Sequence, residues 1–534
     1  IDCDQVLNEI GAFGRYQLRE YLFICLILFL HTGCSFIYIF TASDLNYRCL
    51  IPECEDAHNT TYMTNWLSNA VPFNDKLPAK CDRYVTDNNV PGNGVCFNQN
   101  NEQNLEIGKC NEFVYENDEV SILNEWNFTC DFNKWKLTLV GTMNNIGQLF
   151  CCLLTGYISD KYGRRLVLII GTVGGGIMGL IRSFSVNYEM FMVFEFLEPL
   201  VSSGVYATSV ILAMEHVKPN RRVIGLCALN IFYAFGIAYL GVLAIFFTNW
   251  RTLMQVFYTP MIFAFTYFWL ISENVRWLLS TGRKTKALEI FTKIAKVNRK
   301  IDSSLILDKL SSQEFRNENQ EIQSGESLKD VLKHRFLILR ILNCSFCWFT
   351  SVFVYYGLSI NSVSLAGNKY LNFILAGLIE IPAFFLTFIS MEKLGRKISL
   401  SGSLFCSGFA CILYEFINDD QFWIKLLVFL FGKLSITFAF SVLYVYTTEI
   451  YPTSLRQSLL AVCSMMGRFG SILAPQMPLL ILIWAPLSAV LYGSFSLVAG
   501  FLVLNLPETK NYQLPDTIEE AKFTEKPKQC SNKN

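Results

Sequence analysis

The chain has 534 residues, of which 52% are hydrophobic and 15% aromatic, and only 16% carry a charge. A soluble domain does not need so much apolar surface to fill its core, so the composition excludes an ordinary soluble protein and indicates that lipid is the solvent. The 44 basic and 44 acidic side chains cancel, which excludes the strong positive charge of most nucleic-acid-binding domains.

Apolar stretches of about 20 residues, the length that crosses a bilayer core, recur along the whole chain. The first six are Tyr21–Ala42, Leu137–Ile158, Leu166–Phe184, Tyr188–Met214, Ile224–Phe247 and Leu253–Ile271. The last six are Phe336–Leu358, Tyr370–Ile389, Ile398–Phe416, Ile424–Tyr446, Leu459–Leu482 and Leu487–Leu506. The sequence therefore predicts an all-α membrane protein with twelve transmembrane helices.

A long polar loop, residues 44–133, follows the first predicted span. Between Asp44 and Asp131 it has five Lys/Arg against fifteen Asp/Glu, and it contains glycosylation sequons at Asn59 and Asn127. Its six cysteines are Cys49, Cys54, Cys81, Cys96, Cys110 and Cys130. They allow fifteen disulfide pairings, among which the sequence does not choose. Because disulfides persist in oxidising compartments, we expect this loop to face outward.

The segment between the sixth and seventh predicted spans, residues 273–335, has the opposite charge balance. Its thirteen Lys/Arg outnumber nine Asp/Glu, which is typical of the cytoplasmic side. The stretch TGRKTKALEIFTKIAKVNRK has a helical apolar face made of Leu288, Phe291, Ile294, Ala295 and Val297. We predict surface helices here, beneath the bundle. An even number of spans then places both termini, residues 1–20 and 508–534, in the cytoplasm.

One motif at the end of a predicted span occurs twice. The stretch SDKYGRR, residues 159–165, is matched by MEKLGRK, residues 391–397, and the glycines Gly163 and Gly395 lie 232 positions apart. Two further pairs of glutamates recur at almost the same offset. Glu215 and Glu449 are separated by 234 positions, and Glu273 and Glu508 by 235.

Offsets that agree this closely indicate that a six-span unit was duplicated. We expect two six-helix halves, residues 21–272 and 336–507, related by a pseudo-twofold axis. Contacts between the acidic and basic residues of these motifs would latch the cytoplasmic ends while the cavity opens outward. The residues of this predicted cytoplasmic gate are Asp160, Arg164, Arg165, Glu215, Arg222, Glu273, Arg276, Glu392, Arg396, Glu449, Arg456 and Glu508. The alternative is that they are ordinary positively charged anchors on the cytoplasmic side.

Several longer motifs resemble those of the solute carriers for organic cations, organic anions and carnitine. They are IGAFGRYQ (10–17), NEWNFTCD (124–131), ENVRWLLSTGR (273–283), YYGLSIN (355–361), GLIEIPA (377–383), YTTEIYPTSLRQ (446–457) and LPET (506–509). The resemblance covers nearly the whole chain. It implies the major facilitator fold, with a substrate site at mid-membrane between the two halves and transport by alternating access.

Charged residues inside the predicted spans are the first candidates for that site. The eleventh span carries Arg468, at a position where family members that favour anions or carnitine have arginine and cation carriers have aspartate. An unpaired charge in a bundle costs several kcal/mol, so Arg468 should face the cavity and meet either a substrate anion or a protein carboxylate. Glu380 in the eighth span is a second candidate. Glu195 stands where the family usually has arginine, and with Glu198 it either lines the cavity or pairs with neighbours near the outer surface.

Aromatic residues complete the predicted site. By resemblance, Phe40, Tyr233, Tyr355, Tyr356, Phe440 and Tyr444 lie at cavity-facing positions. Aromatic faces attract organic cations by about 0.5–2 kcal/mol. With 45 Phe and 24 Tyr in the chain, simple packing is the alternative for each of them.

The sequence favours a plasma-membrane carrier for small organic ions, namely cations or zwitterions such as carnitine-like solutes, with anions still open. A sugar-porter-like carrier and a membrane receptor that does not transport are the alternatives. An enzyme is not expected, because the four histidines are scattered without metal spacing and no nucleophile motif is present. No cofactor and no metal is predicted. The expected partners are the organic ion and the lipid bilayer, and a coupling sodium ion or proton is left open.

Overall fold

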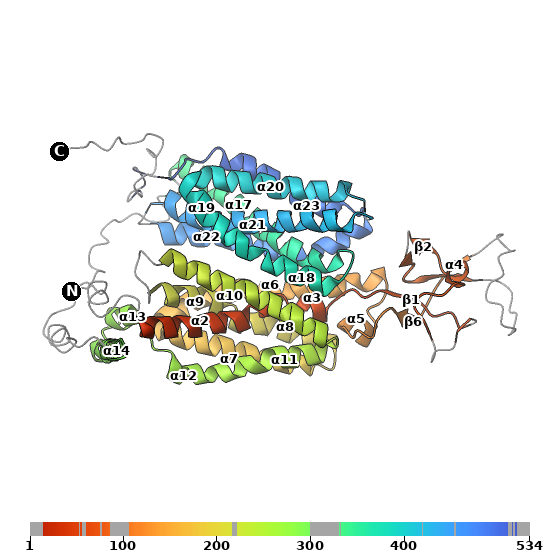
Figure 1. Ribbon diagram of the computed structural model, residues 1–534, viewed down its shortest axis with the longest axis horizontal. Coiled ribbons are helices and arrows are strands. Elements are labelled where there is room, and N and C mark those ends of the chain that lie inside the picture. The colour runs from red at the N-terminus through yellow and green to blue at the C-terminus, as the bar shows by residue number, and fades with distance from the viewer. Residues whose placement is uncertain are drawn as a thin grey trace.

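In the computed structural model, the described residues form a bundle of helices with a small sheet-containing domain at one end (Figure 1). The described residues are 14–52, 54–55, 60–74, 77–85, 106–215, 222–298, 331, 333–418, 420–452, 455–510, 515, 518 and 520.

The helices of the first half follow one another as an antiparallel bundle (Figure 1). They are α2 (Arg15–Thr32), η1 (Gly33–Ser35), α3 (Tyr38–Thr41), α6 (Lys134–Tyr162), α7 (Arg164–Ser183), α8 (Tyr188–Ser202), α9 (Gly204–Glu215), α10 (Arg222–Phe246), α11 (Trp250–Ile262), η4 (Phe263–Thr266) and α12 (Tyr267–Leu270).

The second half repeats this arrangement beside the first (Figure 1). Its helices are α17 (Arg335–Asn361), η6 (Ser362–Ser364), α18 (Lys369–Leu378), α19 (Glu380–Lys393), α20 (Arg396–Phe416), α21 (Phe422–Ile450), α22 (Arg456–Leu473), η7 (Ala474–Leu482) and α23 (Leu487–Val503). Two helices of the connecting segment, α13 (Val275–Ser280) and α14 (Lys284–Val297), lie at one end of the bundle.

Within the described residues, eleven helical segments are long and apolar enough to cross a membrane. They coincide with the first eleven predicted spans, and the shorter apolar helix Leu487–Val503 occupies the position of the twelfth. The prediction of a helical membrane protein is confirmed.

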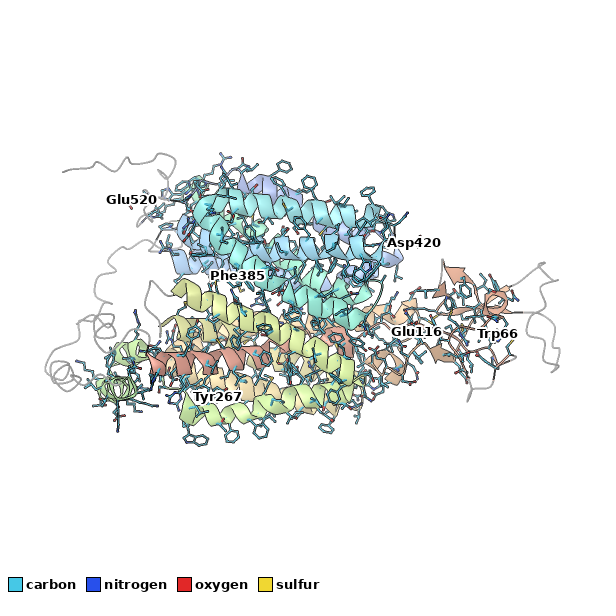
Figure 2. All side chains as sticks on the ribbon, viewed as in Figure 1. Trp66, Glu116, Tyr267, Phe385, Asp420 and Glu520 are labelled. Atoms are coloured by element: carbon cyan, nitrogen blue, oxygen red, sulfur yellow. A yellow bond between two sulfur atoms is a disulfide. The ribbon has the colours of Figure 1, made fainter. Side chains whose placement is uncertain are left out.

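We call the end of the bundle that carries residues 44–133 the loop end, and the opposite end, where Gly163 and Gly395 lie, the motif end. Figure 2 shows Asp420 at the loop end of the second half and Glu520 at the motif end.

The repeated motifs have the same geometry in both halves. Gly163 and Gly395 have φ of 104° and 91°, and each directly precedes a helix that starts at an arginine. The carboxylate of Glu273 accepts a hydrogen bond from the backbone N–H of Arg165 at 3.2 Å. In the second half, Glu508 accepts one from the backbone N–H of Arg396 at 2.9 Å. A carboxylate at a helix N-terminus satisfies free N–H groups and the helix dipole, so both halves fix this turn in the same way.

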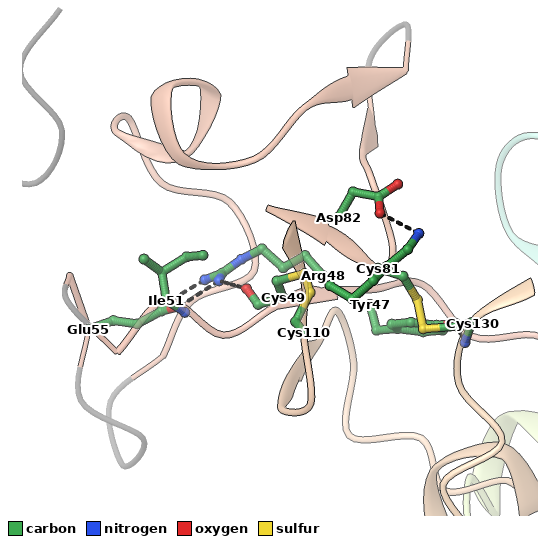
Figure 3. The surroundings of a disulfide bond; sticks show 10 residues. Tyr47, Arg48, Cys49, Ile51, Glu55, Cys81, Asp82, Cys110 and Cys130 are labelled. Carbon is green, nitrogen blue, oxygen red and sulfur yellow. Dashed lines mark hydrogen bonds and ion pairs between the residues drawn. A yellow bond between two sulfur atoms is a disulfide. The ribbon is translucent and has the colours of Figure 1, made fainter. Parts of the chain in front are cut away.

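The loop domain between the first two spans contains three two-stranded antiparallel sheets. They pair β1 (Tyr47–Cys49) with β6 (Phe113–Tyr115), β2 (Phe73–Asn74) with β3 (Leu77–Pro78), and β4 (Asp82–Val85) with β5 (Glu106–Lys109). Two short helices, α4 (Leu67–Ala70) and α5 (Ile122–Glu125), and the turn η2 (Asp131–Asn133) complete the described part. Of the predicted disulfide cysteines, Cys49 pairs with Cys110 and Cys81 with Cys130 (Figure 3). Cys96 and Asn59 lie outside the described residues, whereas Asn127 is exposed.

Arg48 is the central polar residue of the loop domain. Its guanidinium is fully buried and makes a two-pronged ion pair with Glu55, at 2.6 and 2.7 Å (Figure 3). It also donates to the backbone carbonyls of Cys49 and Tyr62, both at 2.8 Å. These bonds join strand β1 to two later stretches of the loop, at Glu55 and at Tyr62.

We expect Arg48→Ala to destabilise the loop domain by about 3–5 kcal/mol, because it leaves the Glu55 carboxylate buried without a partner. Faster cleavage of the loop by added protease, followed on gels, would measure this loss. Lys109→Ala is the matched control. Lys109 pairs with Asp82 at 2.6 Å but is 78% exposed, so its loss should cost below about 1 kcal/mol. Equal protease sensitivity of the two variants would contradict the role given to Arg48.

The two halves contact one another closely at the loop end. Gln476 of the second half donates to Thr142 of the first at 2.6 Å, and Lys369 pairs with Glu119 at 2.5 Å. The hydrogen bonds between Glu273 and Arg165 and between Glu508 and Arg396, by contrast, stay within one half. The described contacts therefore close the loop end.

Candidate functional site

A buried ammonium site lies in the second half, near the middle of two spans. Lys433 of α21 and Glu380 of α19 are each 1% exposed, and Lys433 Nζ lies 3.2 Å from Glu380 Oε1. The same Nζ donates to Ser359 Oγ at 2.6 Å and sits 3.3 Å from the centre of the Tyr355 ring. A carboxylate, a hydroxyl and an aromatic face thus surround one ammonium group, which is the combination that binds organic cations.

Local sequence explains why Glu380 is placed there. Pro382 has no N–H to donate, so the eighth span breaks between α18 and α19, and Glu380 is the first residue of the new helix. A helix start offers free backbone N–H groups and the positive end of the helix dipole, which favours a carboxylate. The break therefore stabilises a negative charge near the middle of a membrane span.

Four of the predicted aromatic residues form one cluster around this site. The Tyr355 ring lies 5.5 Å from that of Tyr356 and 6.5 Å from that of Phe440. Trp348 contacts Phe440 and Tyr444 at 5.5 and 5.7 Å. The cluster presents several ring faces beside Lys433 and Glu380.

The first half adds two tyrosines that face this cluster. Tyr233 packs against Tyr206 with 5.6 Å between ring centres, and both phenols lie near Glu380 and Tyr356. Residues of the two halves thus meet at the site.

Phe40 has a different setting from the other predicted aromatics. It is only 4% exposed, and it contacts Phe373 and Tyr370 of the second half at 5.0 and 5.8 Å. Phe40 thus belongs to the loop-end closure in this conformation.

Arg468 lies near the middle of the eleventh span and is half-buried. Its Nη1 donates to Gln148 Oε1 of the first half at 3.0 Å. Arg468 therefore spans the interface between halves, held by an amide, and no ion pair involving it was found among the described residues.

Glu195 and Glu198 lie inside the first half, within the helix bundle. Glu195 Oε2 pairs with Arg182 Nη1 of α7 at 2.6 Å, and both side chains are fully buried. Glu198 Oε1 accepts from Ser202 at 2.7 Å. Of the two alternatives that the sequence leaves open, the structure shows the pairing with neighbours.

The residues of the predicted gate are arranged mainly within each half. Arg164 pairs with Asp160 at 2.9 Å, and Arg396 pairs with Glu449 at 3.0 Å. Glu392 is exposed at the end of α19. The side chains of Glu215 and Arg222 lie outside the described part, and the latch between halves stays a prediction.

Two more members of the gate are placed by the structure. Arg276 lies in the first turn of α13, after Asn274, whose side chain caps that helix. Arg456 is the first residue of α22. Both are therefore at the motif end.

A vestibule opens at the loop end, above the contacts that close it. Its volume is about 910 Å³, and it is lined by residues of both halves and of the loop domain, including Tyr38, Glu119, Lys369 and Pro475. Asp44, one of the acidic residues that line the vestibule, pairs with Lys80 at 2.7 Å. The vestibule marks where the pathway would open on this side.

Comparison with known proteins agrees with this geometry. The family model of the Major Facilitator Superfamily matches residues 131–475. The chain is 30% identical to Solute carrier family 22 member 3 of Rattus norvegicus, over 97% of this chain and 95% of that protein. The chain belongs to solute carrier family 22.

A further relative and a solved structure are also similar to this chain. The Organic cation transporter protein of Drosophila melanogaster is 30% identical over 98% of this chain and 95% of its own length. A partially occluded, inward open structure of the xylose transporter XylE from E. coli has a TM-score of 0.57 at 15% identity, covering 92% of this chain and 99% of that one. At this identity the likeness shows the fold alone.

Three residues of this family 22 site were not predicted. Lys433 stands alone in the apolar stretch LVFLFGKLSI, and an isolated lysine within a span is by itself a signal of function. Tyr206 and Gln148 carry no such signal, because a single tyrosine or amide is common in helical spans. Only the packing of the two halves identifies them.

Proposed function

We propose that this protein carries small organic ions with a cationic nitrogen, zwitterions included, across the plasma membrane by alternating access. The observation that carries the proposal is the setting of Lys433. Its ammonium lies against Glu380, Ser359 and the Tyr355 ring, so the protein already binds one ammonium group in the way a substrate would be bound. A relative named Organic cation transporter protein supports it.

In this mechanism the substrate cation replaces Lys433. The Glu380 carboxylate attracts the incoming positive charge, and the rings of Tyr355 and Tyr356 cover it. Lys433 moves aside when the substrate binds. When no substrate is bound, Lys433 pairs with Glu380 and keeps the site neutral, because an unpaired carboxylate at this depth would be costly. Exchange between a tethered and a free ammonium needs little reorganisation of the surrounding dipoles.

Arg468 extends the range of substrates to zwitterions. A carboxylate carried by the substrate would meet a guanidinium that donates a hydrogen bond to the neutral Gln148 amide. A guanidinium binds carboxylate through two parallel hydrogen bonds. We therefore place the cationic end of a zwitterion at Glu380 and the anionic end at Arg468.

We further propose that the loop end faces outward. Its disulfides and the exposed sequon at Asn127 suit an oxidising compartment in which glycans are attached. The basic motif end then faces the cytoplasm, and the described contacts represent a state closed to the outside.

Uptake into proteoliposomes tests the proposal. The purified chain would be offered radiolabelled tetraethylammonium, carnitine, glutarate and glucose, each with and without a sodium gradient. We expect saturable uptake of tetraethylammonium or carnitine that excess unlabelled cation suppresses. Saturable uptake of glucose alone would favour a sugar porter, and no saturable uptake of any probe would favour a receptor.

A further inference from the structure

A chain of hydrogen bonds leads from the substrate site into the core of the first half. Arg468 Nη1 donates to Gln148 Oε1 at 3.0 Å. Gln148 Nε2 donates to Asn144 Oδ1 at 2.9 Å and more weakly to Ser35 Oγ at 3.5 Å. Asn144 Nδ2 donates to Glu195 Oε1 at 2.8 Å. We call these four side chains, Arg468, Gln148, Asn144 and Glu195, the amide relay.

The chemistry at the two ends fixes the direction of the relay. A carboxylate only accepts hydrogen bonds and a guanidinium only donates them, whereas an amide does both, through opposite ends of its group. Because Glu195 accepts, Asn144 must turn its NH₂ group toward it and its oxygen toward Gln148. Gln148 must then donate to Asn144 and present its oxygen to Arg468.

Because the relay is buried, its amide groups cannot reverse their donor and acceptor ends without losing hydrogen bonds. Asn144 and Glu195 are fully buried and Gln148 is 2% exposed, so water does not offer alternative partners. Glu195 is itself held in place by Arg182 at 2.6 Å, and Arg182 also donates to Tyr258 at 2.7 Å. A flipped amide would leave two acceptors or two donors facing one another without compensation.

We infer that Glu195, although it lies outside the substrate site, is a positioning residue that orients the Gln148 carbonyl toward Arg468 and thereby holds Arg468 for the substrate. This inference deepens the proposed function and rests on it. An arginine at this position would donate to Asn144 and reverse the relay. The carboxylate of this chain thus gives the cavity an acceptor that steadies its arginine.

The test uses two substitutions that together move the carboxylate of the relay from position 195 to position 148. Gln148→Glu places a carboxylate next to Asn144, whose NH₂ group is already bound to Glu195, so two acceptors compete for one donor group. Glu195→Gln removes that competition, because an amide at position 195 can donate to Asn144. The double variant Q148E/E195Q has the same net charge as the wild type and a relay in which every group has a partner.

We expect Q148E alone to lower kcat/KM for carnitine uptake about tenfold or more, the effect of leaving a buried carboxylate oxygen without a donor on the Asn144 side. The double variant should recover to within about threefold of the wild type. Uptake of carnitine into proteoliposomes gives kcat and KM, uptake of tetraethylammonium is the comparison with a substrate that has no carboxylate for Arg468, and the unfolding temperature in detergent gives a second readout that needs no substrate. The same suppression is expected in both readouts.

Asn145→Asp is the matched control, because Asn145 is buried beside the relay but bonds to the carbonyl of Gly141 at 2.8 Å. Its defect should not be suppressed by Glu195→Gln. Additive losses in Q148E/E195Q, in both uptake and unfolding temperature, would overturn the inference. Absence of uptake by the wild type would instead contradict the proposed function, and the unfolding temperatures would still decide the relay.

Discussion

Glu380→Gln is expected to abolish saturable uptake of tetraethylammonium. The substitution removes the negative charge that attracts the substrate and leaves Lys433, 1% exposed, as an uncompensated buried cation. Breaking a buried pair by removal of one partner costs about 3–5 kcal/mol. The initial rate of uptake into proteoliposomes and the monodisperse yield of purified protein would measure the two effects separately.

The double variant E380Q/K433M separates transport from stability. It removes both charges, so the folded yield should return close to that of the wild type, because neutral replacement of a buried pair is often tolerated. Transport should stay lost, since the carboxylate is the substrate's partner. Uptake by the double variant at the wild-type rate would show that Glu380 acts only as a structural partner of Lys433.

The second large effect is expected at the repeated glycine turns. Gly395 has φ 91° and ψ 172°, a region that costs a residue with a side chain about 1–3 kcal/mol. A Cβ there would also lie 2.7 Å from a carboxylate oxygen of Glu508, the group that binds the start of α20. Gly163 has the equivalent relation to the carboxylate of Glu273. We expect Gly395→Ala and Gly163→Ala each to lower the unfolding temperature strongly.

Each turn has a control glycine on an adjoining helix. A Cβ added to Gly402 of α20 or to Gly156 of α6 would have no neighbouring atom within 4 Å. Gly→Ala at these two sites should therefore be neutral or slightly stabilising, as alanine favours helices. Scanning fluorimetry of the four variants in detergent would compare them. Similar unfolding temperatures for Gly395→Ala and Gly402→Ala would contradict the role of the turn.

The spans and the duplication were predictable because they depend on local properties. Hydropathy over about 20 residues marks a membrane helix, and repeated motifs keep their spacing whatever the packing. The offset of 235 positions indicates that Glu273 and Glu508 are equivalent, and both carboxylates bind the start of the helix that follows a glycine turn.

The pairing of charges was not predictable to the same extent. Glu195 and its partner Arg182 lie on different helices, and only the tertiary packing decides that they meet inside the first half. The disulfide pairs Cys49–Cys110 and Cys81–Cys130 likewise depend on how an irregular loop folds.

The aromatic residues fall between these cases. The resemblance selected Tyr355 and Tyr356, which lie beside the ammonium site, but it also selected Phe40, which packs in the loop-end closure. Lys433 was missed although an isolated lysine in an apolar span could have drawn attention to it. A sequence motif thus indicates where a residue lies in the fold. Which residues it contacts depends on the conformation of the protein, and in this conformation the loop end is closed.

Distance measurement across both ends of the bundle tests alternating access most directly. Spin labels on genetically encoded amino acids, which avoid the 18 cysteines, would be placed at exposed Lys161 and Lys393 for the motif end, and at exposed Thr248 and Asn368 for the loop end. With tetraethylammonium present, a second population should appear in which the loop-end distance is longer and the motif-end distance shorter. Unchanged distances at both ends in protein that transports the cation would contradict the account.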